Sequence, residues 1–96
     1  MTQTPHDSGE VRRRRLLFRA THRGTHENDL MIGGFVAPRI NTLTAAELDA
    51  LEEILELPDV ALADWLTGRA PIPPENDTPM LRRIRDAAAD AARTAS

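Results

Sequence analysis

The sequence predicts an all-α fold, a small single-domain bundle of about five helices. Apolar residues recur every three or four positions in several segments, which is the spacing of the buried face of a helix. Capping residues, glycines and prolines separate these segments. No long segment alternates apolar with polar residues, as a half-buried strand would. A chain of 96 residues supports one core of this kind.

The two ends of the chain are expected to lie outside the bundle. Residues 1–9 are polar and include Pro5 and Gly9, so we expect a disordered N-terminal tail. The helical bundle domain should occupy residues 10–92, and residues 93–96 should form a frayed C-terminal tail.

The first helix is predicted over about residues 10–22 and the second over residues 25–35. Gly24 lies between them and suits a C-cap or a tight turn, and Pro38 ends the second helix. One glycine of the second helix should lie close to another backbone, although each glycine there costs about 1 kcal/mol relative to alanine. The apolar residues expected to face inward from these helices are Val11, Leu16, Leu17, Phe18, Ala20, Leu30 and Met31.

The third helix has the clearest boundaries. Thr44 and Glu47 form a capping box, in which each side chain satisfies a free backbone donor of the other residue. Leu43 and Leu48 can form the hydrophobic staple around this cap. Pro58 ends the helix.

Two more helices follow, separated by a proline-rich loop over residues 69–77. Asp59 can cap the fourth helix, and Gly68 closes it. Thr78 precedes Pro79 at the start of the fifth helix, where the missing donor of proline does no harm. The apolar residues expected to face inward from the last three helices are Leu48, Leu51, Ile54, Leu55, Leu62, Trp65, Leu66, Met80, Leu81, Ile84 and Ala88.

The composition excludes several classes of protein. Without cysteine the chain has no disulfides, iron–sulfur clusters, thiolate zinc sites or cysteine nucleophile. Its apolar runs are too short to span a membrane, and no apolar segment of a secretion signal follows the N-terminus. We therefore expect a soluble, cytoplasmic protein without membrane insertion.

Charge is distributed unevenly along the chain. All 12 basic residues are arginines, and 15 acidic residues bring the net charge to −3. Most of the arginines precede residue 41, whereas residues 41–77 are rich in acidic residues and contain only Arg69 as a base. The molecule should therefore have a basic end and an acidic middle.

The segment over residues 23–29 is the main candidate for a functional site. It places the guanidinium of Arg23, the flexible Gly24 and the carboxylates of Glu27 and Asp29 together at a helix start. The plainer interpretation is a capped turn with solvated charges. The functional interpretation is a rigid surface patch that offers Arg23 and Glu27 to a partner, since arginine makes bidentate bonds.

Other functional interpretations find less support in the residues. His22 and His26 have the spacing of two metal ligands on a helix, but Gly24 separates them and no further ligand suggests itself, so we expect no metal site. The run of arginines over residues 12–15 could bind nucleic acid, but the overall acidity argues against it. No nucleophile with an orienting acid is evident. The residues alone therefore indicate a helical interaction module.

Three segments carry a family resemblance. They are Arg13-Arg14-Arg15-Leu16-Leu17-Phe18-Arg19, the motif Arg23-Gly24-x-x-Glu27-x-Asp29-Leu30, and the ending Trp65-Leu66-Thr67-Gly68. Single residues between the last two segments add to it, namely Gly33, Phe35, Leu48, Leu51, Leu55, Asp59 and Leu62. On these residues the chain resembles the succinate dehydrogenase assembly (flavinylation) factor family, of the SdhE or YgfY type, over about residues 11–68. His22 stands where a further arginine is common in that family, and Thr25 and His26 fill variable positions.

The resemblance implies a five-helix bundle that binds the flavoprotein subunit of succinate dehydrogenase or fumarate reductase. It implies a non-catalytic assembly factor that promotes covalent attachment of FAD to that subunit. The FAD belongs to the partner, no cofactor is expected to be held stably, and whether the chain contacts FAD itself stays open. The protein itself is expected to be a monomer. The partner-binding residues implied are Arg23, Gly24 and Glu27, with Asp29, Arg19 and Arg15. A general helical adaptor or a toxin-neutralising protein is the alternative.

Overall fold

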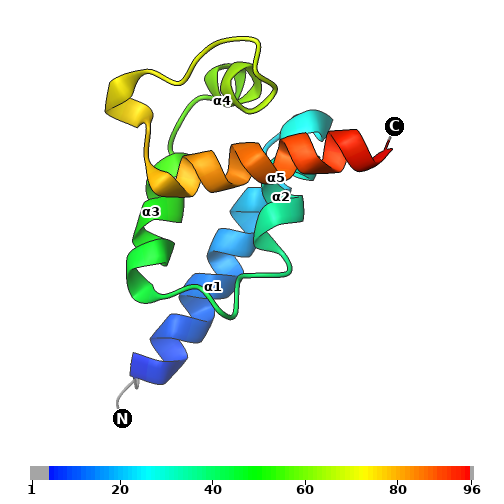
Figure 1. Cartoon of the computed structure of the whole chain (residues 1–96). Coiled ribbons are helices and arrows are strands. Elements are labelled where there is room, and N and C mark those ends of the chain that lie inside the picture. The colour runs from blue at the N-terminus through cyan, green and yellow to red at the C-terminus, as the bar shows by residue number, and fades with distance from the viewer. Residues whose placement is uncertain (1–4, 96) are drawn as a thin grey trace.

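Across residues 5–95, whose backbone the computed structural model describes, the chain forms five α-helices and no strand (Figure 1). The all-α fold predicted from the sequence is confirmed. The elements, in chain order, are α1 (Pro5–Thr21), α2 (His26–Val36), α3 (Ala45–Leu55), α4 (Asp59–Leu66), the short 3-10 helix η1 (Pro74–Asn76) and α5 (Pro79–Ala95).

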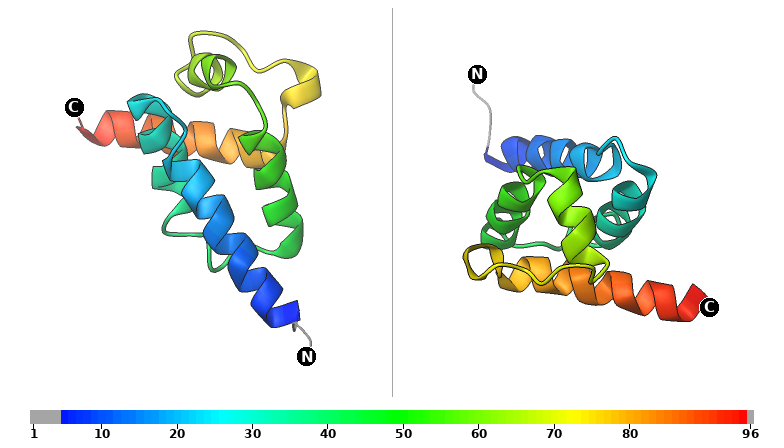
Figure 2. Two further views of the ribbon diagram at one scale, coloured as in Figure 1. Left: turned by 180° about the vertical axis from the view of Figure 1, so that it is seen from behind. Right: turned by 90° about the horizontal axis from the view of Figure 1, so that it is seen from above.

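The helices surround a single core. In the right-hand view of Figure 2, α1 and α5 lie on opposite sides of the molecule, with α2, α3 and α4 between them. Both α1 and α5 pack against α2 and α3, and α4 packs against α2 and α5. The C-terminal end of α5 projects past the other helices. No helix among the described residues is both long and apolar enough to cross a membrane.

The turn between α1 and α2 is held in place by close packing. A Cβ atom at Gly33 would lie only 2.9 Å from Thr21 Cγ2 and 3.4 Å from the carbonyl oxygen of Ala20. This confirms the prediction that a glycine of the second helix lies close to another backbone. Thr25 caps α2, because its hydroxyl accepts from the backbone N–H of Asn28 at 3.3 Å.

Most of the residues predicted to face inward do so. The buried apolar side chains are Leu16, Ala20, Ile32, Phe35, Val36, Ile40, Leu43, Leu48, Leu51, Ile54, Leu55, Leu62, Leu66, Met80, Leu81 and Ile84. Leu17, Met31, Trp65 and Ala88 are half-buried. The prediction was wrong for Val11, Phe18 and Leu30, which are exposed. Only one face of α1 meets the bundle, so its other apolar residues lie at the surface.

Some predicted boundaries differ from the structure. Helix α1 begins at Pro5 and so includes residues 5–9, which were expected to be disordered. Proline is well suited to a first helical position, because its missing N–H has no partner there in any case. Residues 1–4 of the predicted tail lie outside the described residues. At the other end α5 continues to Ala95, and Ser96 also lies outside them.

The start of α4 corrects a second expectation. Asp59 does not cap this helix, as was predicted, but is its first residue, and Pro58 occupies the cap position without a side-chain bond. The carboxylate of Asp59 instead accepts hydrogen bonds from Arg23 and Asn28, far away in the sequence. The sequence around Asp59 has the pattern of a helix cap, but the Asp59 carboxylate accepts hydrogen bonds from distant residues instead of from the first turn of α4.

The start of α3 follows the prediction. Thr44 Oγ1 accepts from the N–H of Glu47 at 3.1 Å, and Glu47 Oε1 accepts from the N–H of Thr44 at 2.8 Å, which completes the capping box. Glu47 Oε2 also accepts from Arg83 Nη1 at 3.0 Å, so the same carboxylate ties α3 to α5.

Glu47 should make the stability of the bundle depend on pH. The N–H of Thr44, helped by Arg83, holds the pKa of Glu47 below its ordinary value of 4.5. A carboxylate whose pKa falls on folding stabilises the protein above its unfolded-state pKa, and this effect is lost as the pH falls through the folded-state pKa. Glu47→Gln should therefore be less stable than the wild type at neutral pH, and the difference should shrink below pH 4.5. Thermal unfolding of both proteins from neutral pH to below pH 4.5 measures the difference in stability. A difference that does not change with pH would contradict the role assigned to the Glu47 carboxylate.

Two substitutions in α4 should have unequal effects on the free energy of unfolding, because one position is buried and the other is exposed. Leu62→Ala should lower the free energy of unfolding by about 2–5 kcal/mol, because it leaves a cavity at a fully buried position. Val60→Ala, at a side chain that is 76% exposed, should change it by no more than about 0.5 kcal/mol. Urea unfolding followed by circular dichroism measures both, and similar losses would be inconsistent with this core.

Candidate partner-binding site

The predicted site lies at the turn between α1 and α2. Gly24 has a φ of +101°, in the left-handed region that residues with a Cβ atom rarely adopt. A Cβ atom at this position would meet nothing within 4 Å, so the backbone conformation, rather than a lack of space, requires glycine here. The turn is therefore both fixed in shape and open to the approach of another molecule.

The side chain of Arg23 points into the protein. It is only 10% exposed, and its guanidinium donates to three acceptors. Nε donates to Asp59 Oδ1 at 2.9 Å, Nη1 to the carbonyl oxygen of Leu55 at 2.6 Å, and Nη2 to that of Leu57 at 2.8 Å. Leu55 is the last residue of α3, where carbonyls lack helical partners and favour a positive charge. Arg23 thus joins the α1–α2 turn to the α3–α4 connection.

Two neighbours complete this inward network. The amide nitrogen of Asn28, which is fully buried, donates to the carbonyl oxygen of Asp59 at 2.9 Å and to its Oδ1 at 3.1 Å. Asp29 Oδ1 accepts from the backbone N–H of Arg23 at 2.5 Å. The role of Asn28 was not predicted, although it precedes the buried Ile32 by four residues and so lies on the buried face of α2.

The other side chains at the turn face outward. Glu27 is exposed, and the nearest ion contact of its carboxylate is 3.9 Å from Arg69 Nη2. Phe18 and Leu30 are 61% and 62% exposed, which is high for large apolar side chains. His22 stacks on Phe18 with 4.0 Å between the ring centroids. We call Phe18, His22, Gly24, Glu27 and Leu30 the turn surface.

The two histidines near the turn are arranged differently from the metal-ligand pair considered above. His22 Nδ1 lies 2.9 Å from the carbonyl oxygen of Phe18 and 3.0 Å from Thr21 Oγ1, whereas His26 is exposed at the start of α2. Among the side chains that the structure describes, no three histidine, aspartate or glutamate residues come together as a metal site would require.

The arginines of α1 are divided between internal bonds and the surface. Arg12 pairs with Asp49 at 2.6 Å and with Glu52 at 2.9 Å, and Arg19 pairs with Glu56 at 2.7 Å. The basic end and the acidic middle of the chain therefore meet at the contact between α1 and α3. Arg13 also bonds internally, since its Nη1 donates to the carbonyl oxygens of Ile40 and Leu43. Arg14 and Arg15 are exposed and make no hydrogen bond or ion pair within residues 9–94.

The six residues predicted to bind a partner therefore fall into two sets. Those at the surface are Arg15, Gly24 and Glu27. Those whose side chains bond within the chain are Arg19, Arg23 and Asp29. The motif that joins Arg23 to Glu27 has one end in the interior and the other in solvent.

Loss of the Arg23 side chain should destabilise the fold. Arg23→Ala removes one donor each from the half-buried Asp59 carboxylate and from the carbonyl oxygens of Leu55 and Leu57, so the free energy of unfolding should fall by about 2–4 kcal/mol. Arg15→Ala is the matched control and should change it by no more than about 0.5 kcal/mol, since that side chain is exposed. Chemical unfolding compares them, and an unaffected Arg23→Ala would exclude the structural role.

Comparisons with known proteins identify the family. A family model described as the flavinator of succinate dehydrogenase matches residues 14–88, which include the turn surface and the Arg23 network. The chain is 59% identical over 78 residues to the FAD assembly factor SdhE of Acetobacter pasteurianus, covering 81% of this chain and 72% of that protein. It is 33% identical over 76 residues to the mitochondrial succinate dehydrogenase assembly factor 2 of Dictyostelium discoideum, covering 79% of this chain and 54% of that protein.

A similar relationship holds for an insect relative. The chain is 32% identical over 84 residues to the mitochondrial succinate dehydrogenase assembly factor 2-A of Drosophila ananassae, covering 85% of this chain. The chain spans about half the length of these two mitochondrial relatives, 54% in each case. The resemblance read from the sequence is confirmed, and the chain belongs to the family of flavinators of succinate dehydrogenase.

Proposed function

We propose that this protein binds the flavoprotein subunit of succinate dehydrogenase and promotes the covalent attachment of FAD to it. The family match and the names of the relatives support this function. The single structural observation that carries the site assignment is the turn surface, which contains an exposed carboxylate, that of Glu27, and two exposed apolar side chains, Phe18 and Leu30. Fumarate reductase, whose flavoprotein subunit is related, is the other candidate partner.

The turn surface has the properties of a docking site. Glu27 can accept hydrogen bonds from an arginine or lysine of the partner, because its contact with Arg69 is long. Phe18 and Leu30 supply apolar area whose burial favours association. Gly24 lets the partner backbone come close to the turn. Arg15, which is exposed on α1, can add a charged contact at the edge.

Arg23 supports binding indirectly in this proposal. Its three bonds to the α3–α4 connection fix the turn before the partner arrives, so less conformational entropy is lost on binding. Arg23 and Asp29 are thus positioning residues, whereas Glu27 and the apolar side chains make the contact.

We infer that the protein positions the flavoprotein subunit for the reaction and contributes no catalytic group of its own. Holding the flavoprotein subunit with its acceptor residue near the flavin can lower the barrier of attachment without a catalytic group on the helper. In this proposal the FAD is held by the partner, the helper is not an enzyme, and it acts as a monomer.

Glu27→Gln tests the docking site directly. Covalent flavin in the flavoprotein subunit should fall by about tenfold, which corresponds to the loss of one charge-assisted contact. The fold should be unaffected, since among the side chains that the structure describes the Glu27 carboxylate makes only the long contact with Arg69. In-gel flavin fluorescence of the subunit, in cells that lack their own factor, measures the effect.

Glu53→Gln is the matched control, because Glu53 is also an exposed glutamate, on α3 and outside the turn surface. It should leave flavin attachment unchanged. If a folded Glu27→Gln protein supported normal flavin attachment, the turn surface would not be the docking site.

A further inference from the structure

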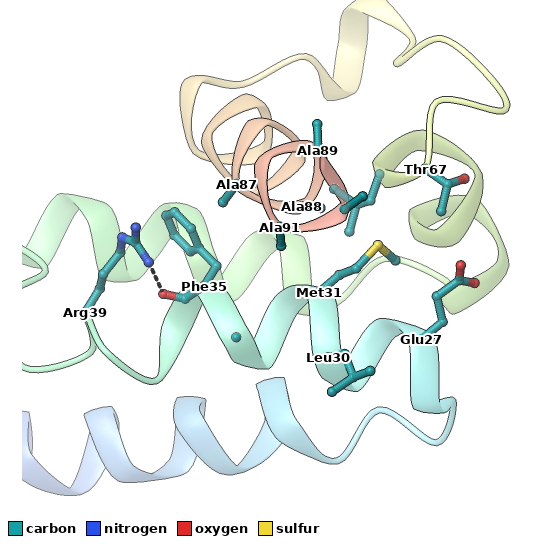
Figure 3. A pocket seen from close by; sticks show the side chains of 13 residues that line it. Glu27, Leu30, Met31, Phe35, Arg39, Thr67, Ala87, Ala88, Ala89 and Ala91 are labelled. Atoms are coloured by element: carbon teal, nitrogen blue, oxygen red, sulfur yellow. Dashed lines mark hydrogen bonds between the residues drawn. The ribbon is translucent and has the colours of Figure 1, made fainter. Parts of the chain in front are cut away.

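A groove opens where the C-terminal half of α5 crosses over α2 (Figure 3). Its volume is about 650 Å³. Met31 and Phe35 of α2 form one wall, and the alanines of α5, among them Ala88 and Ala91, form the other. The end of α4 closes one side at Thr67.

The walls of the groove are suited to another helix. The alanine side chains of α5 are small, and helices approach more closely where the side chains at the contact are small. The walls are mainly apolar, so they offer little to the backbone of an extended segment. A helix satisfies its own backbone hydrogen bonds and can bury an apolar face in such a groove.

The two ends of the groove carry opposite charges. Glu27 lies at one end and Arg39 at the other (Figure 3), and they are the charged residues of its lining. The Arg39 guanidinium donates to the carbonyl oxygen of Phe35 at 2.8 Å and stacks 4.2 Å above the Phe35 ring. It has no carboxylate partner among the described side chains. Within the described part of the chain, the one ion contact of Glu27 is its long contact with Arg69.

We propose that this groove binds an amphipathic helix of the flavoprotein subunit. The helix would place an apolar face against Met31 and the α5 alanines, a basic residue opposite Glu27 and an acidic residue opposite Arg39. Arg39 follows Glu27 by twelve positions, most of them in α2, so the two charges of the guest should be separated by about 15–18 Å at 1.5 Å per residue.

This inference rests on the proposed function, because it takes the guest from the proposed partner. The link is Glu27, which belongs both to the turn surface and to the lining of the groove. A partner seated on the turn therefore reaches one end of the groove without a gap. The charge at the far end, on Arg39, selects guests with an acidic residue at the matching distance.

Filling the groove tests the proposal. Ala91→Trp places a large ring between α5 and α2 and should weaken binding of the purified flavoprotein subunit by about tenfold. Ala46→Trp, at an exposed alanine of α3 outside the groove, should leave binding within about twofold of the wild type. Calorimetric titration measures the affinities, and circular dichroism confirms that both variants are folded.

A photo-crosslinking amino acid at position 91 identifies the guest. We expect a cross-linked peptide from an amphipathic helix of the flavoprotein subunit, with a basic and an acidic residue at its two ends. Arg39→Glu should reduce this cross-link, and the same probe at position 46 should give none. A cross-link to a second copy of this chain, or full affinity of Ala91→Trp with no cross-link, would overturn the groove assignment while leaving the proposed function standing. Failure of the wild type to bind the subunit at all would overturn both.

Discussion

The arrangement of the site depends on the hydrogen bonds that the guanidinium of Arg23 donates. This group joins the α1–α2 turn to the end of α3 and to the start of α4 through the carbonyl oxygens of Leu55 and Leu57 and the carboxylate of Asp59. Arginine suits this place because its planar group presents several donors in fixed directions. The carbonyl groups at the end of a helix need such donors. One side chain therefore donates to three acceptors at the α3–α4 connection, and it orients the turn in the same step.

This arrangement explains how the short motif from Arg23 to Glu27 can both fix the shape of the turn and present a side chain to a partner. Arg23 and Glu27 are four positions apart, and Gly24 between them has a left-handed backbone conformation. The Arg23 side chain points into the protein, and the Glu27 side chain is exposed. The inward residue sets the shape, and the outward residue is left available for recognition. Asn28 and Asp29 strengthen the inward half from the first turn of α2. Rigid presentation of an exposed carboxylate favours association because little freedom remains to be lost.

Local signals in the sequence predicted much of the fold, and long-range contacts account for the errors. The capping box of Thr44 and Glu47 and the break at Gly24 depend on neighbours in the chain, so they could be predicted. The burial of Arg23 could not, because its acceptors lie more than thirty residues away. The same contact removes the Asp59 carboxylate from its expected capping role. Phe18 and Leu30 have the helical spacing of core residues, but no other helix covers them.

The attachment of α1 has a consequence for how the protein responds to its surroundings. Besides its few buried apolar residues and its ion pairs with carboxylates, this part of the chain is held by Arg13 and Arg23, which also donate to backbone carbonyl oxygens. Arginine keeps its proton throughout the physiological range, and a carbonyl oxygen does not titrate. A histidine or lysine in either place would have linked the position of the turn to proton concentration. The bonds from Arg13 and Arg23 to backbone carbonyl oxygens therefore add no pH dependence of their own to the position of the turn.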